Sequence, residues 1–190
     1  GMVVPATAYA HTNIVNGMSY YRRDGHFANA ACVAGVHPDD LANRTLSPLE
    51  ALDFVESLEQ KFFSLTKNFA SPVCSISDFI NGKAKTNAFQ SSYPLALEPL
   101  PLWELLPQVV VKSMKEGLKD FSRKMRAFDS GNLLGLESKT SSPVQVLRGE
   151  GGLCTGFSNL YMVGEGSGFA GGIISNAADG LKAALHFARK

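Results

Sequence analysis

The sequence of 190 residues lacks an excess of charge of either sign, because 18 Lys and Arg residues stand against 17 Asp and Glu residues. Binding to nucleic acid or to an anionic membrane surface requires a basic patch. Here the basic residues are scattered among acidic ones. We therefore predict neither nucleic acid nor a membrane as a partner.

Long apolar runs and cysteine pairs are also missing. No segment approaches the run of about 20 apolar residues that crosses a bilayer, and the N-terminus does not resemble a secretory signal. We therefore expect a cytoplasmic protein. The three cysteines, Cys32, Cys74 and Cys154, form no C-x-x-C pair, and the four histidines show no ligand spacing. This pattern favours buried, inert thiols and predicts no metal site.

Hydrophobic periodicity predicts three helices. Ser47 precedes a first-turn proline and Glu50 follows three residues later, which is a capping box at the start of a helix over residues 48–66. A second apolar stripe predicts a helix over residues 107–128, and a third predicts a C-terminal helix from about Gly172.

Shorter apolar and β-branched runs predict strands, and the fold class is therefore α+β with a mainly antiparallel sheet. Between the first two runs, Asn16-Gly17 and Asp24-Gly25 are typical turn dipeptides. The segment 71–107 contains five prolines and no clear periodicity, so only short helical turns are expected there. The predicted strands are residues 2–10, 28–36, 133–136, 144–147 and 160–163.

The pattern G-x-G-x-x-G occurs once, at residues 166–171, after an apolar run and before a helical pattern. A complete dinucleotide site would need a second strand after that helix, with an acid about 20 residues on, but the sequence ends at Lys190. The loop could still offer N–H groups and a helix end to an anion, as the closing part of a larger cofactor site. Alternatively, the glycines only allow close packing.

Three blocks of sequence resemble, in the same order, a bacterial family of largely uncharacterised NAD/FAD-utilising, FAD-dependent dehydrogenases. The first block includes Asn16-Gly17-Met18-Ser19, the second is a Ser/Thr-rich loop, and the third contains the glycine pattern. The blocks are residues 15–20 with 23–25 and 28–29, residues 137–144 with Arg148, and residues 164–173 with 178–180.

The resemblance implies a split architecture. Residues 1–150 would form a substrate-side insertion domain, and residues 151–190 would be the C-terminal segment of an FAD-binding domain. The partner of the chain would be the N-terminal FAD-binding half of the same polypeptide, the cofactor of the full-length protein would be FAD, and its substrate would be a small molecule. The chain alone is not expected to hold FAD tightly or to be active. The alternative is a free-standing, non-catalytic binding or interaction module.

The resemblance also assigns candidate site residues, although no catalytic residue. Glu165 takes the position of an acid that accepts a hydrogen bond from the flavin ribityl chain, whereas the simpler interpretation is a surface turn residue. Thr140, Ser141, Ser142 and Arg148 are candidates for substrate or cofactor contact, since hydroxyl groups and a guanidinium bind anions; without the resemblance, the loop would be a polar turn. The cofactor-binding candidates are Gly164, Glu165, Gly166, Gly168, Gly171 and Gly172.

Overall fold

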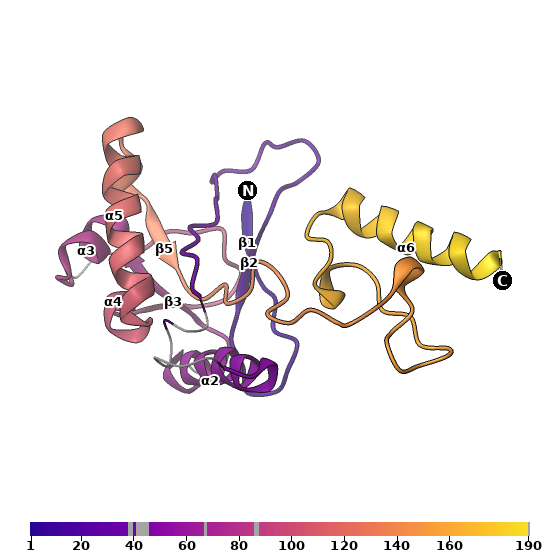
Figure 1. Ribbon diagram of the computed structural model, residues 1–190. Helices are drawn as coiled ribbons and strands as arrows, with labels where there is room; N and C mark the ends of the chain where they lie inside the picture. Colours follow the sequence, from indigo (N-terminus) through magenta and orange to yellow (C-terminus); the bar gives the residue numbers. More distant parts are fainter. Residues whose placement is uncertain (38–39, 41–45, 67, 86–87, 190) are drawn as a thin grey trace. The chain divides into compact units, whose positions relative to one another are not determined.

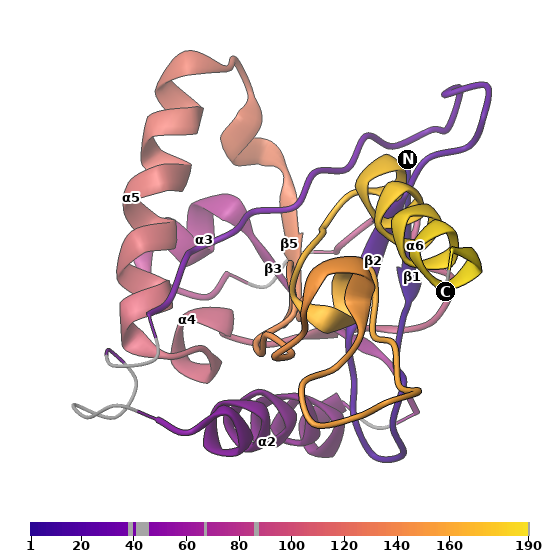
Figure 2. The same cartoon turned by 45° about the vertical axis from the view of Figure 1, so that its right-hand side comes forward.

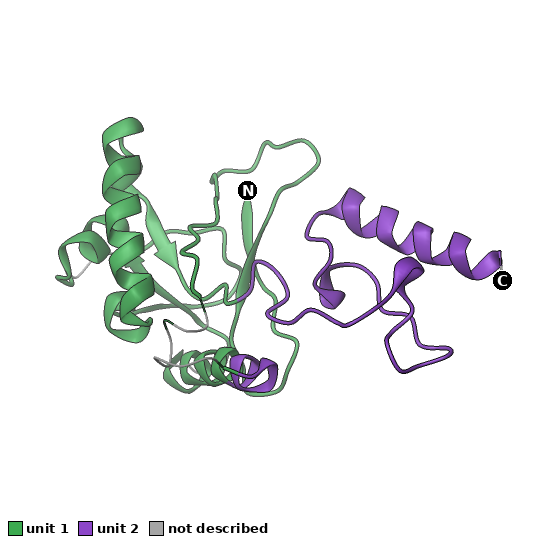
Figure 3. Ribbon diagram, in the orientation of Figure 1, with its two compact units in different colours: residues 1–46, 54–138 green, residues 47–53, 139–190 purple. Residues whose placement is uncertain are grey.

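A computed structural model describes residues 1–37, 40, 46–66, 68–85 and 88–189. Figure 1 shows the elements in chain order, and Figure 3 divides the chain into two compact units, residues 1–46 with 54–138 and residues 47–53 with 139–190. The strands are β1 (Met2–Pro5), β2 (Val15–Met18), β3 (Ser71–Ser75), β4 (Leu97–Pro99) and β5 (Asn132–Leu134). The helices are α2 (Pro48–Thr66), α3 (Ile76–Asn81), α4 (Leu102–Leu105), α5 (Gln108–Lys124) and α6 (Ile173–Ala188), with 3₁₀ turns η1 (Phe128–Ser130), η2 (Glu150–Gly152) and η3 (Glu165–Ser167).

The α+β class with mainly antiparallel pairing is confirmed. The first unit contains an antiparallel β1–β2 ribbon and a three-stranded sheet in the order β4-β3-β5. In that sheet β3 runs parallel to β4 and antiparallel to β5. In Figures 1 and 2, α3 lies beside α5.

Strands β3 and β4 both lie in the segment 71–107, for which only short helical turns are expected, so that expectation is wrong for residues 71–75 and 97–99. Proline is disfavoured inside a sheet because it lacks an N–H group. Pro72, however, precedes Val73, the residue at which the ladder with β5 begins. On the side of β5, Pro72 bonds through its carbonyl, which accepts from the N–H of Gly135. Short helices α3 and α4 follow in the same segment, whose residues 86–87 are outside the described part.

The predicted helices are confirmed. The capping box begins α2 as expected, because Ser47 N–H donates to Glu50 Oε2 at 2.9 Å and Glu50 N–H donates to Ser47 Oγ at 3.3 Å. Helix α5 ends at Lys124, four residues before the expected end at Phe128, since Met125 is extended and Ala127 has a φ of 61°. Helix α6 starts at Ile173, next to the predicted Gly172.

The N-terminal strands differ from the prediction, because β1 pairs with residues 15–18 and residues 28–36 form no strand. Asn16-Gly17 therefore lies inside a strand, and the tight turn nearby is at Tyr20–Arg23 and not at Asp24-Gly25. Asn29, in the second predicted strand, instead contacts the β1–β2 ribbon through its side chain, because Nδ2 donates to the carbonyls of Met2 and Met18 at 2.9 and 3.2 Å.

The core of the first unit is formed by α2, β3, α3, α4, α5 and β5 around Phe62, Phe79 and Leu118, each at most 1% exposed. All three cysteines are free thiols, with Cys74 and Cys154 buried and Cys32 half-buried. Burial raises the pKa of Cys74 to about 12, which keeps its thiol protonated and inert, as expected. Across the described ranges, no helix has both the length and the apolar character required to cross a membrane.

Two further predicted strands, residues 144–147 and 160–163, are wrong as strands. In the described part of the second unit, up to Arg189, these segments pair through single antiparallel bridges, Arg148 with Cys154 and Leu153 with Tyr161. A ladder needs consecutive paired residues, and here the chain turns at η2 before a second pair can form. The strand predicted at residues 133–136 is present as β5, which spans Asn132–Leu134 and ends two residues earlier than predicted.

Candidate functional site

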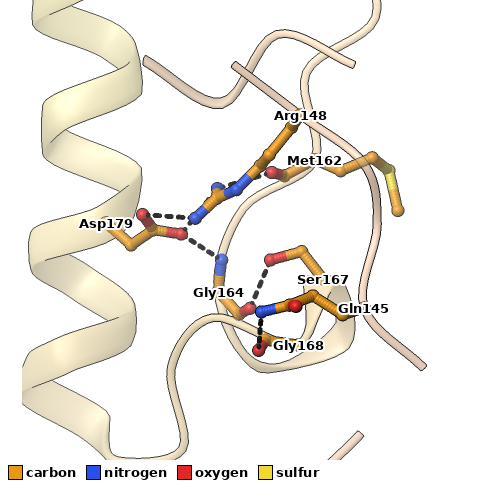
Figure 4. Close-up of polar contacts among 7 residues, drawn as sticks. All are labelled: Gln145, Arg148, Met162, Gly164, Ser167, Gly168 and Asp179. Carbon is orange, nitrogen blue, oxygen red and sulfur yellow. Dashed lines mark hydrogen bonds and ion pairs between the residues drawn. The ribbon is translucent and has the colours of Figure 1, made fainter. Parts of the chain in front are cut away.

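The glycine-rich loop at residues 164–172 lies in the second unit, in contact with the segment that follows the Ser/Thr-rich loop. Val146 N–H donates to the carbonyl of Ser167 at 3.0 Å, and Gln145 Nε2 donates to the carbonyl of Gly168 at 3.3 Å (Figure 4). Ser142 Oγ lies 3.5 Å from the carbonyl oxygen of Gly166. The structure thus brings the second and third sequence blocks together.

Arg148 and Asp179 join this loop to α6. Arg148 Nη1 and Nη2 each donate to one oxygen of Asp179 at 2.9 Å, and Nη1 also donates to the carbonyl of Met162 at 2.7 Å (Figure 4). The other bond to Asp179 comes from Gly164 N–H, at 2.8 Å. The guanidinium also lies 3.8 Å from the centre of the Phe169 ring.

In this geometry, the Arg148 guanidinium binds other residues of the same chain. Its side chain is 7% exposed and both ends of its planar fork are occupied by the Asp179 carboxylate. A ligand could therefore use the fork only by displacing Asp179. Arg148 holds the strand-to-helix turn in shape, and its assignment to substrate or cofactor contact stays a prediction.

The Arg148–Asp179 ion pair makes the stability of the second unit depend on pH in the acid range. Hydrogen bonds from Arg148 first and from Gly164 N–H second lower the pKa of the Asp179 carboxyl. The unfolded-state value is about 3.9, so this stabilisation is present above that pH and is lost as the pH falls through the lower folded-state pKa. We expect Asp179→Asn to reduce stability at neutral pH and to flatten its decline in acid.

The test is urea unfolding at neutral pH and at about pH 3, monitored on the amide NMR signals of residues 148–179. Asp120→Asn is the matched control, because Asp120 pairs with Lys124 on the exposed face of α5 and such surface pairs contribute little. Equal effects of the two variants would contradict the internal role of the Arg148–Asp179 pair.

Three glycines of the loop, Gly168, Gly166 and Gly171, differ in what surrounds them. At Gly168, φ is 81°, and a Cβ atom would lie 2.5 Å from the carbonyl oxygen of Val144, so the fold itself requires glycine there. At Gly166 and Gly171, φ is not in the left-handed region, and a Cβ atom would meet no described atom within 4 Å. These two positions leave open space over the backbone.

Helix α6 begins without a side-chain cap. Gly172 occupies the N-cap position and has no side chain to accept from the first-turn N–H groups; instead Ser175 Oγ accepts from Gly172 N–H at 3.0 Å. Nearby on α6, Asn176 Oδ1 is buried and finds no hydrogen-bond partner in the described part of the chain. An uncapped helix N-terminus carries about half a positive charge, so this end can accept an anionic or electron-rich group.

Of the remaining predicted site residues, Thr140, Ser141 and Glu165 are exposed and Ser142 is half-buried. Glu165 opens the η3 turn, and Ser167 Oγ closes that turn by donating to the carbonyl of Gly164 at 2.6 Å. Thr140 and Ser141 are exposed on the loop before Ser142. The hydroxyl of Ser142 is used internally, because it donates to the carbonyl of Val144 at 2.8 Å.

Sequence reasoning missed Asp179 and Asn176 as members of this site. Asp179 belongs to the third sequence block, where an acid next to the apolar stripe of α6 is a signal for a partner within the chain. Its pairing with Arg148 joins residues 31 apart and depends on the fold. Asn176 carries no signal in the sequence, since its isolation is a property of packing.

The fold and this geometry define an α+β protein whose C-terminal helix begins at an uncapped, glycine-rich turn. Residues 1–140 match the family described as "FAD-dependent protein, C-terminal domain-like", and the chain belongs to this family. The glycine-rich loop lies beyond the matched residues. An uncharacterised protein of Clostridium beijerinckii is 37% identical over 195 residues, which cover 100% of this chain and 36% of that relative. The chain thus spans about a third of the length of this curated relative.

Proposed function

We propose that the chain is part of an FAD-dependent oxidoreductase of the dehydrogenase type, in which the glycine-rich loop and the start of α6 contact the flavin end of the cofactor. The observation that carries the proposal is the uncapped N-terminus of α6 next to open backbone at Gly166 and Gly171. The family description supports FAD as the cofactor.

The residues present fit an FAD group in three respects. Among the residues that the structure describes, no side chain caps the first-turn N–H groups of α6 and none bonds to the buried Oδ1 of Asn176, and Gly166 and Gly171 leave space for close approach. Bound FAD would supply hydride acceptance. This chain would position the flavin and stabilise negative charge that develops on it, by about 0.3 to 1 kcal/mol at an exposed helix end.

The proposed partner is the remaining part of a longer polypeptide, an N-terminal half that binds the rest of the dinucleotide. Two observations support it. The chain covers only 36% of its relative. Side chains of α6 also remain uncovered, with Ile173 88% and Ile174 82% exposed, whereas apolar groups of this size are usually buried. The substrate would be a small molecule that reacts at the flavin.

Glu165 provides the direct test of the flavin contact. We expect Glu165→Ala in the full-length protein to weaken FAD binding by about 10- to 100-fold, because a hydrogen bond to a charged group contributes roughly 1.5 to 3 kcal/mol. Flavin retention is measured by visible absorbance and by titration of the apoprotein with FAD. Glu150→Ala is the control, since Glu150 is also an exposed acid of the second unit but lies outside the loop.

Two outcomes would argue against the proposal. Equal FAD affinity in the Glu165→Ala and Glu150→Ala variants would remove Glu165 from the site. A full-length protein that is colourless and takes up no flavin would favour the alternative, a non-catalytic binding or interaction module.

A further inference from the structure

A buried carboxylate lies on the inner face of α2, where an apolar residue would be expected. Glu59 is 1% exposed and shares this face with Phe62 and Thr66, at three- and seven-residue spacing. Burying a carboxylate is unfavourable unless hydrogen bonds compensate. Its partners therefore indicate why the position holds an acid.

Glu59 connects α2 to two distant segments. Ser138 Oγ donates to Glu59 Oε1, and the N–H of Asn13 donates to the carbonyl of Glu59 at 3.2 Å. The side chain of Asn13 extends the contact, since Nδ2 donates to Thr66 Oγ1 at 2.9 Å and to the carbonyl of Ala70 at 2.8 Å. Glu59 thus bonds to Asn13, 46 positions before it in the sequence, and to Ser138, 79 positions after it.

The segment that ends at Ser138 is held by different elements in succession. Gly135 bonds to β3, because its N–H donates to the carbonyl of Pro72 and its carbonyl accepts from Ser71 Oγ. The carbonyl of Leu136 accepts from Val15 N–H, on β2, at 2.7 Å. Ser138 is then held by Glu59, and it is the last residue of the first unit.

We infer that Glu59 is a positioning residue for the Ser/Thr-rich loop, because its bond to Ser138 holds the start of this loop and thereby restrains residues 139–142, which follow the last residue of the first unit. Gly135 and Leu136 have partners on β3 and β2, so we expect loss of the Ser138 bond to affect the chain from Glu137 onward and not before it. That the loop meets a ligand rests on the function proposed above; the positioning by Glu59 does not.

This role leads to opposite effects on the core and on the loop. Glu59→Leu removes the acceptor and introduces an apolar side chain of similarly good helix propensity, and replacing buried charge by apolar residues is often neutral or stabilising. We expect thermal stability to be unchanged or higher, while amide hydrogen exchange of residues 138–142 becomes about tenfold faster. Exchange at residues 133–136 should stay as in the unmodified chain.

Two further variants separate positioning from general stability. Glu59→Gln keeps an acceptor for the Ser138 hydroxyl, so exchange in residues 138–142 should return to within about threefold of the unmodified rate. Ser138→Ala removes the donor at a half-buried position and should accelerate exchange in the loop as Glu59→Leu does. It therefore tests the inference even if the Glu59→Leu variant folds poorly.

The measurement is hydrogen exchange of the 190-residue chain, monitored by mass spectrometry in the absence of flavin. Its outcome therefore does not depend on whether the proposed function is correct. The inference is overturned if Ser138→Ala leaves loop exchange unchanged. It is equally overturned if Glu59→Gln accelerates loop exchange as much as Glu59→Leu, because the loss would then follow the charge and not the bond to Ser138.

Discussion

Replacing Gly168 with alanine is expected to destabilise the second unit by about 2 to 5 kcal/mol, since a left-handed conformation costs an L-residue roughly 1 to 2 kcal/mol and overpacking typically adds about 1 to 3 kcal/mol. The φ of Gly168 is 81°, and the new Cβ atom would lie 2.5 Å from the carbonyl oxygen of Val144 and 2.8 Å from the Cα atom of Gln145. Both neighbours are backbone atoms, so no side-chain rotation relieves the overlap.

The backbone shift would also strain the bonds that join the two segments. Gln145 Nε2 donates to the carbonyl of Gly168, and Val146 N–H donates to that of Ser167. We therefore expect urea unfolding, monitored on the amide NMR signals of residues 144–168, to begin at lower denaturant concentration in Gly168→Ala, while signals from the first unit stay unchanged.

Gly166→Ala is the matched control in the same loop. Its Cβ atom would meet no described atom within 4 Å and its φ is not left-handed, so a change within about 0.5 kcal/mol is expected. If Gly166→Ala destabilised the unit as much as Gly168→Ala, the loop would have a different conformation from the one described.

Local signals in the sequence located helices far better than strands. The start of α2 is predicted to the residue because the reciprocal bonds between Ser47 and Glu50 depend on only four consecutive positions. The apolar stripe of α5 continued past the real end of the helix. Phe128 follows a break yet still contacts Phe121, with ring centres 5.7 Å apart, so its periodic position reflects packing and not helical conformation.

Strand positions depended on long-range partners that composition does not specify. Pro72 argued against a strand, and only the register of β3 with β5 shows that its missing N–H is not needed. Residues 28–36 have strand-like composition, but the side chain of Asn29 occupies the carbonyls of Met2 and Met18. The same holds for the site: the glycine pattern was visible in the sequence, whereas the pairing of Arg148 with Asp179 required the fold.

The 190-residue chain alone is expected to bind FAD weakly, with a dissociation constant of about 5 micromolar or higher. Under the proposed function, this chain contributes one glycine-rich loop and one helix end, at the flavin side of the cofactor. The AMP and pyrophosphate contacts of a dinucleotide site belong to a strand–loop–helix unit of its own, which we assign to the other part of the longer polypeptide. Losing about 5 kcal/mol of contacts converts a nanomolar site into one near 5 micromolar.

Isothermal titration with FAD and with flavin mononucleotide distinguishes which end of the cofactor the chain touches. If only the flavin end is contacted, the two ligands should bind with the same low affinity, because the AMP moiety of FAD finds no partner. The variant Gly171→Ala, whose Cβ atom would enter the open space beside α6, should weaken both equally without affecting the fold. A sub-micromolar affinity for FAD, or binding of FAD far stronger than that of flavin mononucleotide, would show that this chain holds the AMP side as well and that the division of the site between two halves is wrong.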